Sequence, residues 1–323
     1  QATSNYFGYA LTTGDFNSDG KTDLVVGAHR YSSYAGRAYI FYGGSIITED
    51  ASGADVTITG ETASYFGVAL TSGDFNADGK TDLAVSGRGY ASFTGRIYIF
   101  YSQNGQVNTN QSISGNATGD QFGYAMTTGD VNADGRTDLI VGASAYSTYI
   151  GRVYIFYGDG QISTTAGSAD VTITGDGTSY FYFGLQLVSG DFNADGRVDF
   201  GVTALDDGNV YARAYIFYND GSYPSAADSA DAIITGTNST FTLAAGDLNA
   251  DGKTDLIIGD TIENDAYIFY NGSIITENTS GADVTITGDA SSSFGSSLAS
   301  GEMNADGRTD LIVGASAYST YIG

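Results

Sequence analysis

Short apolar runs recur along the whole chain, and glycine, serine, asparagine or aspartate bounds each of them. In the first repeat they cover residues 7–11, 23–28, 36–42 and 54–60. Such runs are five to eight residues long and rich in β-branched and aromatic side chains, which is typical of β-strands. No segment sustains the 3.6-residue apolar period of a helix, so the pattern predicts an all-β protein with almost no helix.

The four runs belong to a repeat that is easiest to follow through the polar string between its first and second runs. The string starts at an acidic residue, and the steps between its six copies are 59, 56, 61, 56 and 55 residues. Four strands in a unit of this length are typical of a propeller blade. A parallel β-helix has shorter repeats, and immunoglobulin-like domains have about 100 residues each.

We therefore predict one β-propeller domain of four-stranded antiparallel blades over residues 1–323. Its six recognisable repeats cover approximately 1–60, 61–115, 116–175, 176–236, 237–288 and 289–323, the last of them incomplete. The ring is predicted to close with six or seven blades. The last repeat stops before its third strand, and an unpaired half-blade would expose sheet edges. We therefore expect the intact protein to be longer.

The polar string reads Asp-x-Asn-x-Asp-Gly-x-x-Asp, which places oxygen atoms at alternate positions of a tight loop. Ca²⁺ takes about six to eight oxygen ligands, and the glycine permits the sharp turn. The string begins like an EF-hand loop, but position 12 is Val or Ile instead of an acid, and a strand follows. Polar turns are the alternative, since Asp, Asn and Gly favour turns. Six copies at fixed offsets favour a calcium loop between two strands of each blade.

Each predicted site combines four side chains with the main-chain carbonyl of the basic residue at position 7. Glu302 is one methylene longer than aspartate, so we expect the sixth site to be looser. The predicted ligands for up to six Ca²⁺ are Asp15, Asn17, Asp19, Lys21 and Asp23; Asp74, Asn76, Asp78, Lys80 and Asp82; Asp130, Asn132, Asp134, Arg136 and Asp138; Asp191, Asn193, Asp195, Arg197 and Asp199; Asp247, Asn249, Asp251, Lys253 and Asp255; and Glu302, Asn304, Asp306, Arg308 and Asp310.

The negative charge of the chain argues against some classes of binding partner. The formal net charge is −25, and 18 of the 37 acidic residues lie in the six loops, so six Ca²⁺ would bring it to about −13. Of the twelve basic residues, six lie in the loops and four open a third strand; only Arg30 and Arg88 lie elsewhere. Nucleic acid and insertion into membranes are not expected, because such a surface repels anions and no apolar run is long enough to span a bilayer. The chain has no cysteine, so no disulfide framework is predicted.

The order Phe-Gly, acidic loop, Asp-Leu-x-Val-Gly-Ala and Gly-Arg-x-Tyr-Ile-Phe-Tyr resembles the FG-GAP repeat of integrin α-subunit propellers and their bacterial relatives. The resemblance covers essentially the whole chain, and it implies a propeller that usually has seven blades. The proline of Gly-Ala-Pro is absent throughout, and the fifth repeat has Phe241-Thr242 for Phe-Gly and lacks Gly-Arg. The Phe-Gly pairs begin at Phe7, Phe66, Phe122, Phe183 and Phe294.

Aromatic residues gather in the loops that join second to third strands. Because the strands of a blade alternate in direction, these loops lie on the face opposite the calcium loops. The resemblance implies ligand recognition on that face, and a tyrosine there offers both a flat apolar ring and a hydroxyl group. The alternative is packing between neighbouring blades. The candidate ligand-binding residues are Tyr31, Tyr34, Tyr90, Phe93, Tyr146, Tyr149, Tyr211, Tyr318 and Tyr321.

These features predict a secreted adhesion or recognition module that binds a glycan or protein ligand at the cell surface. The alternative is a structural unit of a surface layer, fibre or large adhesin, with self-assembly or further domains of a longer chain. No enzyme is predicted, because the single histidine, His29, cannot supply a Ser-His-Asp set and is expected to be an ordinary surface residue. Asp206-Asp207 reads as a turn. The expected calcium affinity is about 10⁻⁴–10⁻³ M, as in extracellular modules.

Overall fold

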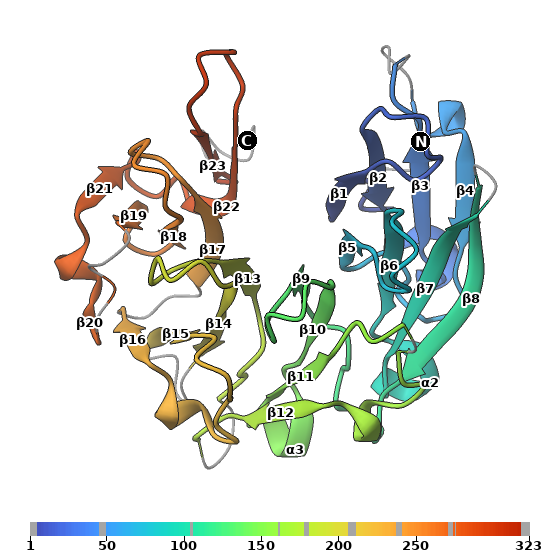
Figure 1. Cartoon of the computed structure of the whole chain (residues 1–323), viewed down its shortest axis with the longest axis horizontal. Coiled ribbons are helices and arrows are strands. Elements are labelled where there is room, and N and C mark those ends of the chain that lie inside the picture. The colour runs from blue at the N-terminus through green and yellow to red at the C-terminus, as the bar shows by residue number, and fades with distance from the viewer. Residues whose placement is uncertain are drawn as a thin grey trace. The chain divides into compact units, whose positions relative to one another are not determined.

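The computed structural model describes residues 5–44, 50–103, 106–160, 162–177, 181–205, 211–236, 241–270, 274 and 276–317. Among these residues the strands form six sheets, of which four have four strands, one has five and one has two (Figure 1). Neighbouring strands within these sheets run antiparallel wherever their register is defined, apart from one parallel pair in the five-stranded sheet. The predicted all-β fold built of four-stranded propeller blades is confirmed.

The first three sheets each follow chain order. The first contains β1 (Leu11–Gly14), β2 (Asp23–Gly27), β3 (Arg37–Phe41) and β4 (Val56–Thr59). The second contains β5 (Leu70–Gly73), β6 (Asp82–Gly87), β7 (Arg96–Gln103) and β8 (Gln106–Ser114). The third contains β9 (Met126–Gly129), β10 (Asp138–Ala143), β11 (Arg152–Phe156) and β12 (Val171–Thr174).

The later sheets depart from this plan in two places. The fourth contains β13 (Leu187–Gly190), β14 (Asp199–Leu205), β15 (Ala212–Phe217) and β16 (Ala232–Thr235), and β20 (Glu277–Asn278) adds a parallel fifth strand beside β16. The fifth contains β17 (Phe241–Gly246), β18 (Asp255–Asp260), β19 (Asp265–Phe269) and β21 (Val284–Thr287). The last described sheet pairs β22 (Phe294–Gly301) with β23 (Asp310–Ala315).

The fifth repeat forms a complete blade although it lacks the Gly-Arg pair. Gly36 of the first repeat has a φ of 78°, and Asn264 occupies the matching position with a φ of 61°. Asparagine tolerates this left-handed conformation better than most residues, since its short side chain can form local hydrogen bonds. The Asn264 amide oxygen accepts a hydrogen bond from the backbone N–H of Ser293 at 2.9 Å. The substitution therefore preserves the turn that opens the third strand.

The Phe-Gly pair does not begin the first strand, as the apolar run 7–11 suggested. β1 starts at Leu11, and the residues before it turn, with a φ of 54° at Tyr6 and 89° at Gly8. In the second repeat Phe66 forms a parallel bridge with Gly36 of the first blade. A Cβ atom added to Gly36 would lie 2.1 Å from the Phe66 carbonyl oxygen. In these two repeats the pair is therefore a turn, and that of the second repeat joins neighbouring blades.

In the second, third and fourth repeats the phenylalanine of this pair is also a core residue. Phe66 is 1% exposed, and its ring meets Tyr98 and Phe100 edge to face at 5.2 and 6.2 Å between centroids. Phe122 and Phe183 make the same pair of contacts with the third strands of their own blades. Each such aromatic pair contributes about 0.5–1.5 kcal/mol beyond area burial.

The chain divides into two compact units. One comprises residues 1–128, 134–147 and 153–172, and the other 129–133, 148–152 and 173–323. Buried side chains of the first and second blades, among them Phe16, Val25 and Val85, form one apolar core within the first unit. A core with Phe192, Ile216 and Ile258 joins the fourth and fifth blades within the second unit. The single-domain assignment, its repeat boundaries and the number of blades in a closed ring stay predictions.

Candidate calcium loops and aromatic face

The six acidic loops share one backbone conformation. Position 4 of each is a non-glycine residue with positive φ, such as Ser18 at 59°, and position 6 is a glycine with positive φ, such as Gly20 at 82°. A Cβ atom at Gly20 would meet nothing within 4 Å, so glycine is needed there for its conformation and not for space. The same pair recurs at Ala77 and Gly79, Ala133 and Gly135, Ala194 and Gly196, Ala250 and Gly252, and Ala305 and Gly307.

Backbone N–H groups hold the acidic side chains of the loop in place. In the first loop Asp15 accepts hydrogen bonds from the N–H groups of Asp19 at 3.0 Å and Gly20 at 2.9 Å. The Asn17 amide oxygen accepts from Asp19, and the Asp19 carboxylate accepts from Lys21, both at 2.9 Å. The second, fourth and fifth loops repeat all four bonds. The loop thus brings together the side chains of positions 1, 3 and 5.

The aspartate at position 9 has a further role that the sequence did not reveal. Asp23 is 1% exposed; its Oδ2 accepts from the N–H of Phe16 at 2.8 Å and its Oδ1 from Gly43 at 2.7 Å. Asp82 and Asp199 make the matching bonds in the second and fourth blades. This side chain therefore ties the loop to the end of the third strand. No sequence signal marks the second donor, which lies twenty residues downstream.

The buried carboxylates are electrostatically unfavourable without a cation. Burial raises the pKa of Asp82 to about 6, against the opposing hydrogen bonds from Ser102 and Phe75, and the charges of Asp78 and Asp74 raise it further. Asp199 has a pKa raised to about 6 for the same reasons. A divalent cation in the loop would favour the charged form of each group.

The donor set fits calcium better than a softer metal. It consists of carboxylate, amide and carbonyl oxygens, the ligands that Ca²⁺ prefers, and an oxygen that accepts one N–H keeps a second lone pair. Among the described residues, no three His, Cys, Asp or Glu side chains form a metal cluster by themselves. The Asn side chain and the position-7 carbonyl are therefore needed to complete a site. The Lys21 ammonium lies 3.7 Å from Asp19 and is exposed, so it can move away from an ion.

The longer Glu302 side chain still reaches the amides of its loop. Some desolvation raises its pKa, but hydrogen bonds from the N–H groups of Asn304, Ala305, Gly307 and Asp306 outweigh that effect and lower it. Asp310 accepts from the N–H of Met303 at 2.8 Å, as position 9 does elsewhere. Calcium occupancy in this and the other loops stays a prediction.

The loops between second and third strands contain left-handed turns. The segments α1 (Tyr31–Tyr34), α2 (Tyr90–Phe93) and α3 (Tyr146–Tyr149) are each four residues long. In α1 the φ angles of Ser32, Ser33 and Tyr34 are 46°, 58° and 64°, and α2 and α3 show the same run of three. Each such residue costs about 1–2 kcal/mol. This backbone gives the two aromatic residues of each turn different surroundings.

The first aromatic residue of each turn packs against its own blade. The Arg37 guanidinium lies 3.6 Å from the ring centroid of Tyr31, and Arg96 lies at the same distance from Tyr90. Arg96 also donates to the Tyr90 hydroxyl, and Tyr146 packs against the apolar core. Packing is therefore the better account of these three residues.

The second aromatic residue of each turn is exposed. Tyr34 is 42% exposed, Phe93 38% and Tyr149 36%. Tyr34 stacks on Tyr65 with 4.8 Å between centroids, and Phe93 lies 5.6 Å from the same ring. Tyr34, Tyr65 and Phe93 thus form a row of rings across the first two blades, which we call the aromatic row. The candidates Tyr318 and Tyr321, and Asp206-Asp207, lie outside the described residues.

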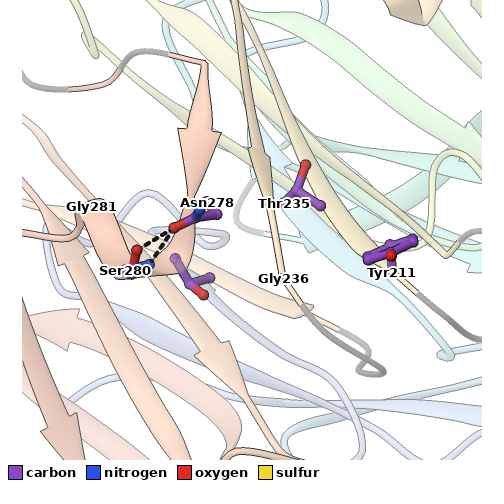
Figure 2. Close-up of a pocket in the computed structure, with 7 residues that line it drawn as sticks. Tyr211, Thr235, Gly236, Asn278, Ser280 and Gly281 are labelled. Atoms are coloured by element: carbon purple, nitrogen blue, oxygen red, sulfur yellow. Dashed lines mark hydrogen bonds between the residues drawn. The ribbon is translucent and has the colours of Figure 1, made fainter.

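Tyr211 lies on a separate cavity of about 820 Å³ within the second unit. Figure 2 shows Tyr211 and Thr235 on one side of this cavity and Asn278 and Ser280 on the other. The Asn278 side chain accepts a hydrogen bond from the Ser280 N–H at 3.0 Å, which fixes that side. The sequence indicated Tyr211 alone, because the opposite wall begins at Asn278 in β20, and the pairing of β20 with β16 is non-local.

His29 is buried, so its prediction as an ordinary surface residue was wrong. It is 3% exposed, and its ring lies 4.2 Å from Tyr9, 5.4 Å from Tyr6 and 6.1 Å from Tyr65 between centroids. Burial lowers its pKa to about 4, and the charges of Arg88 and Arg30 lower it further. Tyrosines from the turns around two Phe-Gly pairs cover the ring, which the local sequence of His29 does not reveal.

Comparison with known families agrees with this geometry. The FG-GAP repeat model matches residues 7–41, 66–100, 122–156 and 294–323, and the FG-GAP-like repeat model matches 191–258. The chain belongs to the FG-GAP repeat family. Each of the four FG-GAP matches begins at the phenylalanine of a Phe-Gly pair, and three of them end within a third strand. The predicted membership is confirmed.

This FG-GAP chain is similar to two kinds of protein. It is 34% identical over 153 residues to phosphatidylinositol-glycan-specific phospholipase D of Bos taurus. This match covers 42% of this chain and 18% of that protein. It is 31% identical over 234 residues to integrin alpha-PS2 of Drosophila melanogaster, covering 67% and 16%, respectively. The chain thus spans less than one fifth of either relative. Within its described part, no helix is long and apolar enough to cross a membrane.

Proposed function

We propose that this FG-GAP chain is a secreted, calcium-stabilised recognition propeller that binds a glycan or protein ligand through its exposed aromatic residues. The exposure of the second aromatic residue in three successive left-handed turns carries this proposal. Strained backbone persists where the surrounding structure holds it, and it concentrates at functional sites. Rings that are already held in place lose little entropy when a ligand binds, so they suit recognition.

Calcium would have a structural role in this proposal. When bound, it would supply positive charge among the three carboxylates of each loop. The residues of the chain do the rest: backbone N–H groups orient positions 1, 3 and 5, and position 9 links the loop to the third strand. Loops of modest affinity fill in millimolar calcium, which is why we propose an extracellular or cell-surface location.

The proposal assigns no catalytic activity to this segment. Its single histidine is buried among tyrosine rings, and the phospholipase relative matches over only a small part of its length. The similarity to an integrin alpha subunit supports adhesion or recognition.

A screen against glycans and cell-surface ligands tests the function, run in millimolar calcium and again with a chelator. Saturable binding that disappears on chelation is expected. A protein that is folded in calcium and binds nothing would contradict the proposal and favour a structural role in a surface layer or fibre.

Loss of the exposed rings is expected to weaken binding without unfolding the protein. The double variant Tyr34→Ala, Phe93→Ala should lose at least about tenfold in affinity, since a central aromatic contact contributes about 2 kcal/mol or more, and its Tm should be nearly unchanged. The matched variant Tyr31→Ala, Tyr90→Ala should lower the Tm, because both rings pack under arginine side chains. Titration of the bound ligand and thermal melts give both readouts. If both double variants lost the same affinity and the same Tm, the exposed rings would have a structural role and not a role in binding.

A further inference from the structure

Two basic residues stand apart from the charge pattern of the chain. The formal net charge is −25, and Arg30 and Arg88 are the two basic residues outside the acidic loops and the openings of third strands. Both lie beside the aromatic row: the Arg30 guanidinium is 5.9 Å from the Tyr34 ring centroid, and Arg88 is 5.8 Å from Tyr65. They place positive charge on an otherwise acidic protein.

Comparison of the repeats shows that this charge is particular to the first two blades. His29-Arg30 of the first repeat corresponds to Arg88-Gly89 of the second. The third repeat has Ser144-Ala145 at the same two positions, and the sixth has Ser-Ala as well. The neighbouring strands are nearly identical in all of them, so the fold does not require basic side chains here.

The guanidinium groups are held in position with donors to spare. Arg30 lies 4.1 Å from the ring centroid of Tyr6, and Arg88 lies 4.8 Å from that of Tyr124. Arg88 donates from Nη1 to Gln121 at 3.4 Å, while its Nε is buried without a hydrogen-bond partner. Among the described residues, neither arginine forms an ion pair. Stacking on tyrosine fixes each planar group and leaves N–H donors for an anion.

A buried polar group under the same rings also lacks a partner. His29 is 97% buried, and its Nδ1 has no hydrogen-bond partner in the described part of the chain. The imidazole lies among the rings of Tyr6, Tyr9 and Tyr65, close enough to both arginines for their charges to lower its pKa. A buried polar atom left unpaired costs free energy, so such an atom in a native protein indicates a water molecule or a ligand.

We propose that Arg30 and Arg88, with His29 beneath them and the rings of Tyr6, Tyr34 and Tyr65, form a binding site for an acidic sugar. The guanidinium forks pair with the carboxylate or sulfate group, and the tyrosine rings stack on the apolar face of the sugar ring. This inference rests on the proposed recognition function, and it specifies that the ligand is an acidic sugar. A sugar fits better than an acidic peptide, because the site offers flat aromatic rings beside its charged groups, and such rings stack on the apolar face of a sugar.

Calorimetric titration in millimolar calcium tests the ligand class. The probes are 3′-sialyllactose and a hyaluronan tetrasaccharide for carboxylates, a heparin tetrasaccharide for sulfates, neutral lactose and a tetraglutamate peptide. At least one acidic sugar is expected to bind at least tenfold more tightly than lactose and than the peptide. Equal binding of lactose, or preferred binding of the peptide, would overturn the assignment.

Variants that copy the third repeat test the residues. Arg30→Ala and Arg88→Ser are each expected to lower acidic-sugar affinity at least tenfold in protein that remains folded. Arg30→Lys keeps the charge but loses the planar guanidinium group, so its affinity for the acidic sugar should lie between those of the wild type and Arg30→Ala. Unchanged affinity in both loss variants would refute the site.

The outcomes also separate this inference from the proposed function. If a neutral glycan or a protein binds through Tyr34 and Phe93 while the arginine variants bind normally, the acidic-sugar site is wrong and the recognition function stands. If no ligand binds in either the broad screen or this titration, both fail.

Discussion

Removal of calcium is expected to lower the Tm of this protein on the order of 15 °C. A site in tenfold excess of ligand over Kd stabilises the fold by about 1.4 kcal/mol, so six loops supply about 8 kcal/mol. A chain of this size gains roughly 2 °C of Tm per kcal/mol. Thermal melts in 10 mM calcium and in chelator measure the shift.

Matched variants assign the shift to the loops. Asp74→Asn should remove about one sixth of the calcium-dependent stabilisation. Asp228→Asn removes the same charge from an exposed residue outside the loops and should leave that stabilisation intact. Magnesium at equal concentration should replace calcium poorly, because it demands octahedral geometry and retains its waters. A Tm that is the same in calcium, magnesium and chelator would show that the loops are polar turns.

Gly36→Ala is expected to cost about 3–5 kcal/mol of folding free energy, because it combines left-handed strain of about 1–2 kcal/mol with a backbone clash. The added Cβ would lie 2.1 Å from the carbonyl oxygen of Phe66 and 2.5 Å from its nitrogen. Both atoms are backbone, so the two blades would have to separate for the methyl group to fit.

Gly119→Ala is the control for Gly36→Ala. Gly119 has a φ of 91° in an exposed loop, and a Cβ there meets nothing within 4 Å. It should therefore cost only the conformational strain of about 1–2 kcal/mol. Urea unfolding of the two variants measures the difference between their losses of folding free energy. Equal losses would mean that the Phe-Gly turn does not hold the first two blades together.

The second, third and fourth strands of the first blade were predictable because they depend on local patterns. Apolar runs bounded by turn residues predicted the limits of β2, β3 and β4 to within two residues at each end. The first strand was misplaced because Phe7 reads as a strand residue but lies in a turn, whose Gly8 and Tyr9 N–H groups donate to the Gly27 carbonyl of β2. An apolar run does not distinguish a strand from a turn that contains aromatic residues when glycine follows.

The candidate site was predictable where its residues are close in sequence. Positions 1 to 9 of the acidic loop lie within one turn, so their spacing indicated their grouping. The burial of His29, the parallel strand β20 and the left-handed turns could not be foreseen, since each depends on contacts between blades or on φ angles that the residues disfavour. The same contacts separate packed Tyr31 from exposed Tyr34.

The most direct test of the central claim is a count of bound calcium. Equilibrium dialysis of the whole chain in millimolar calcium, followed by elemental analysis, should give about six ions per chain. It should give about five for Asp74→Asn, with Asp228→Asn unchanged. A count near zero in folded protein would contradict a calcium-stabilised propeller and leave the loops as turns held by their own backbone hydrogen bonds.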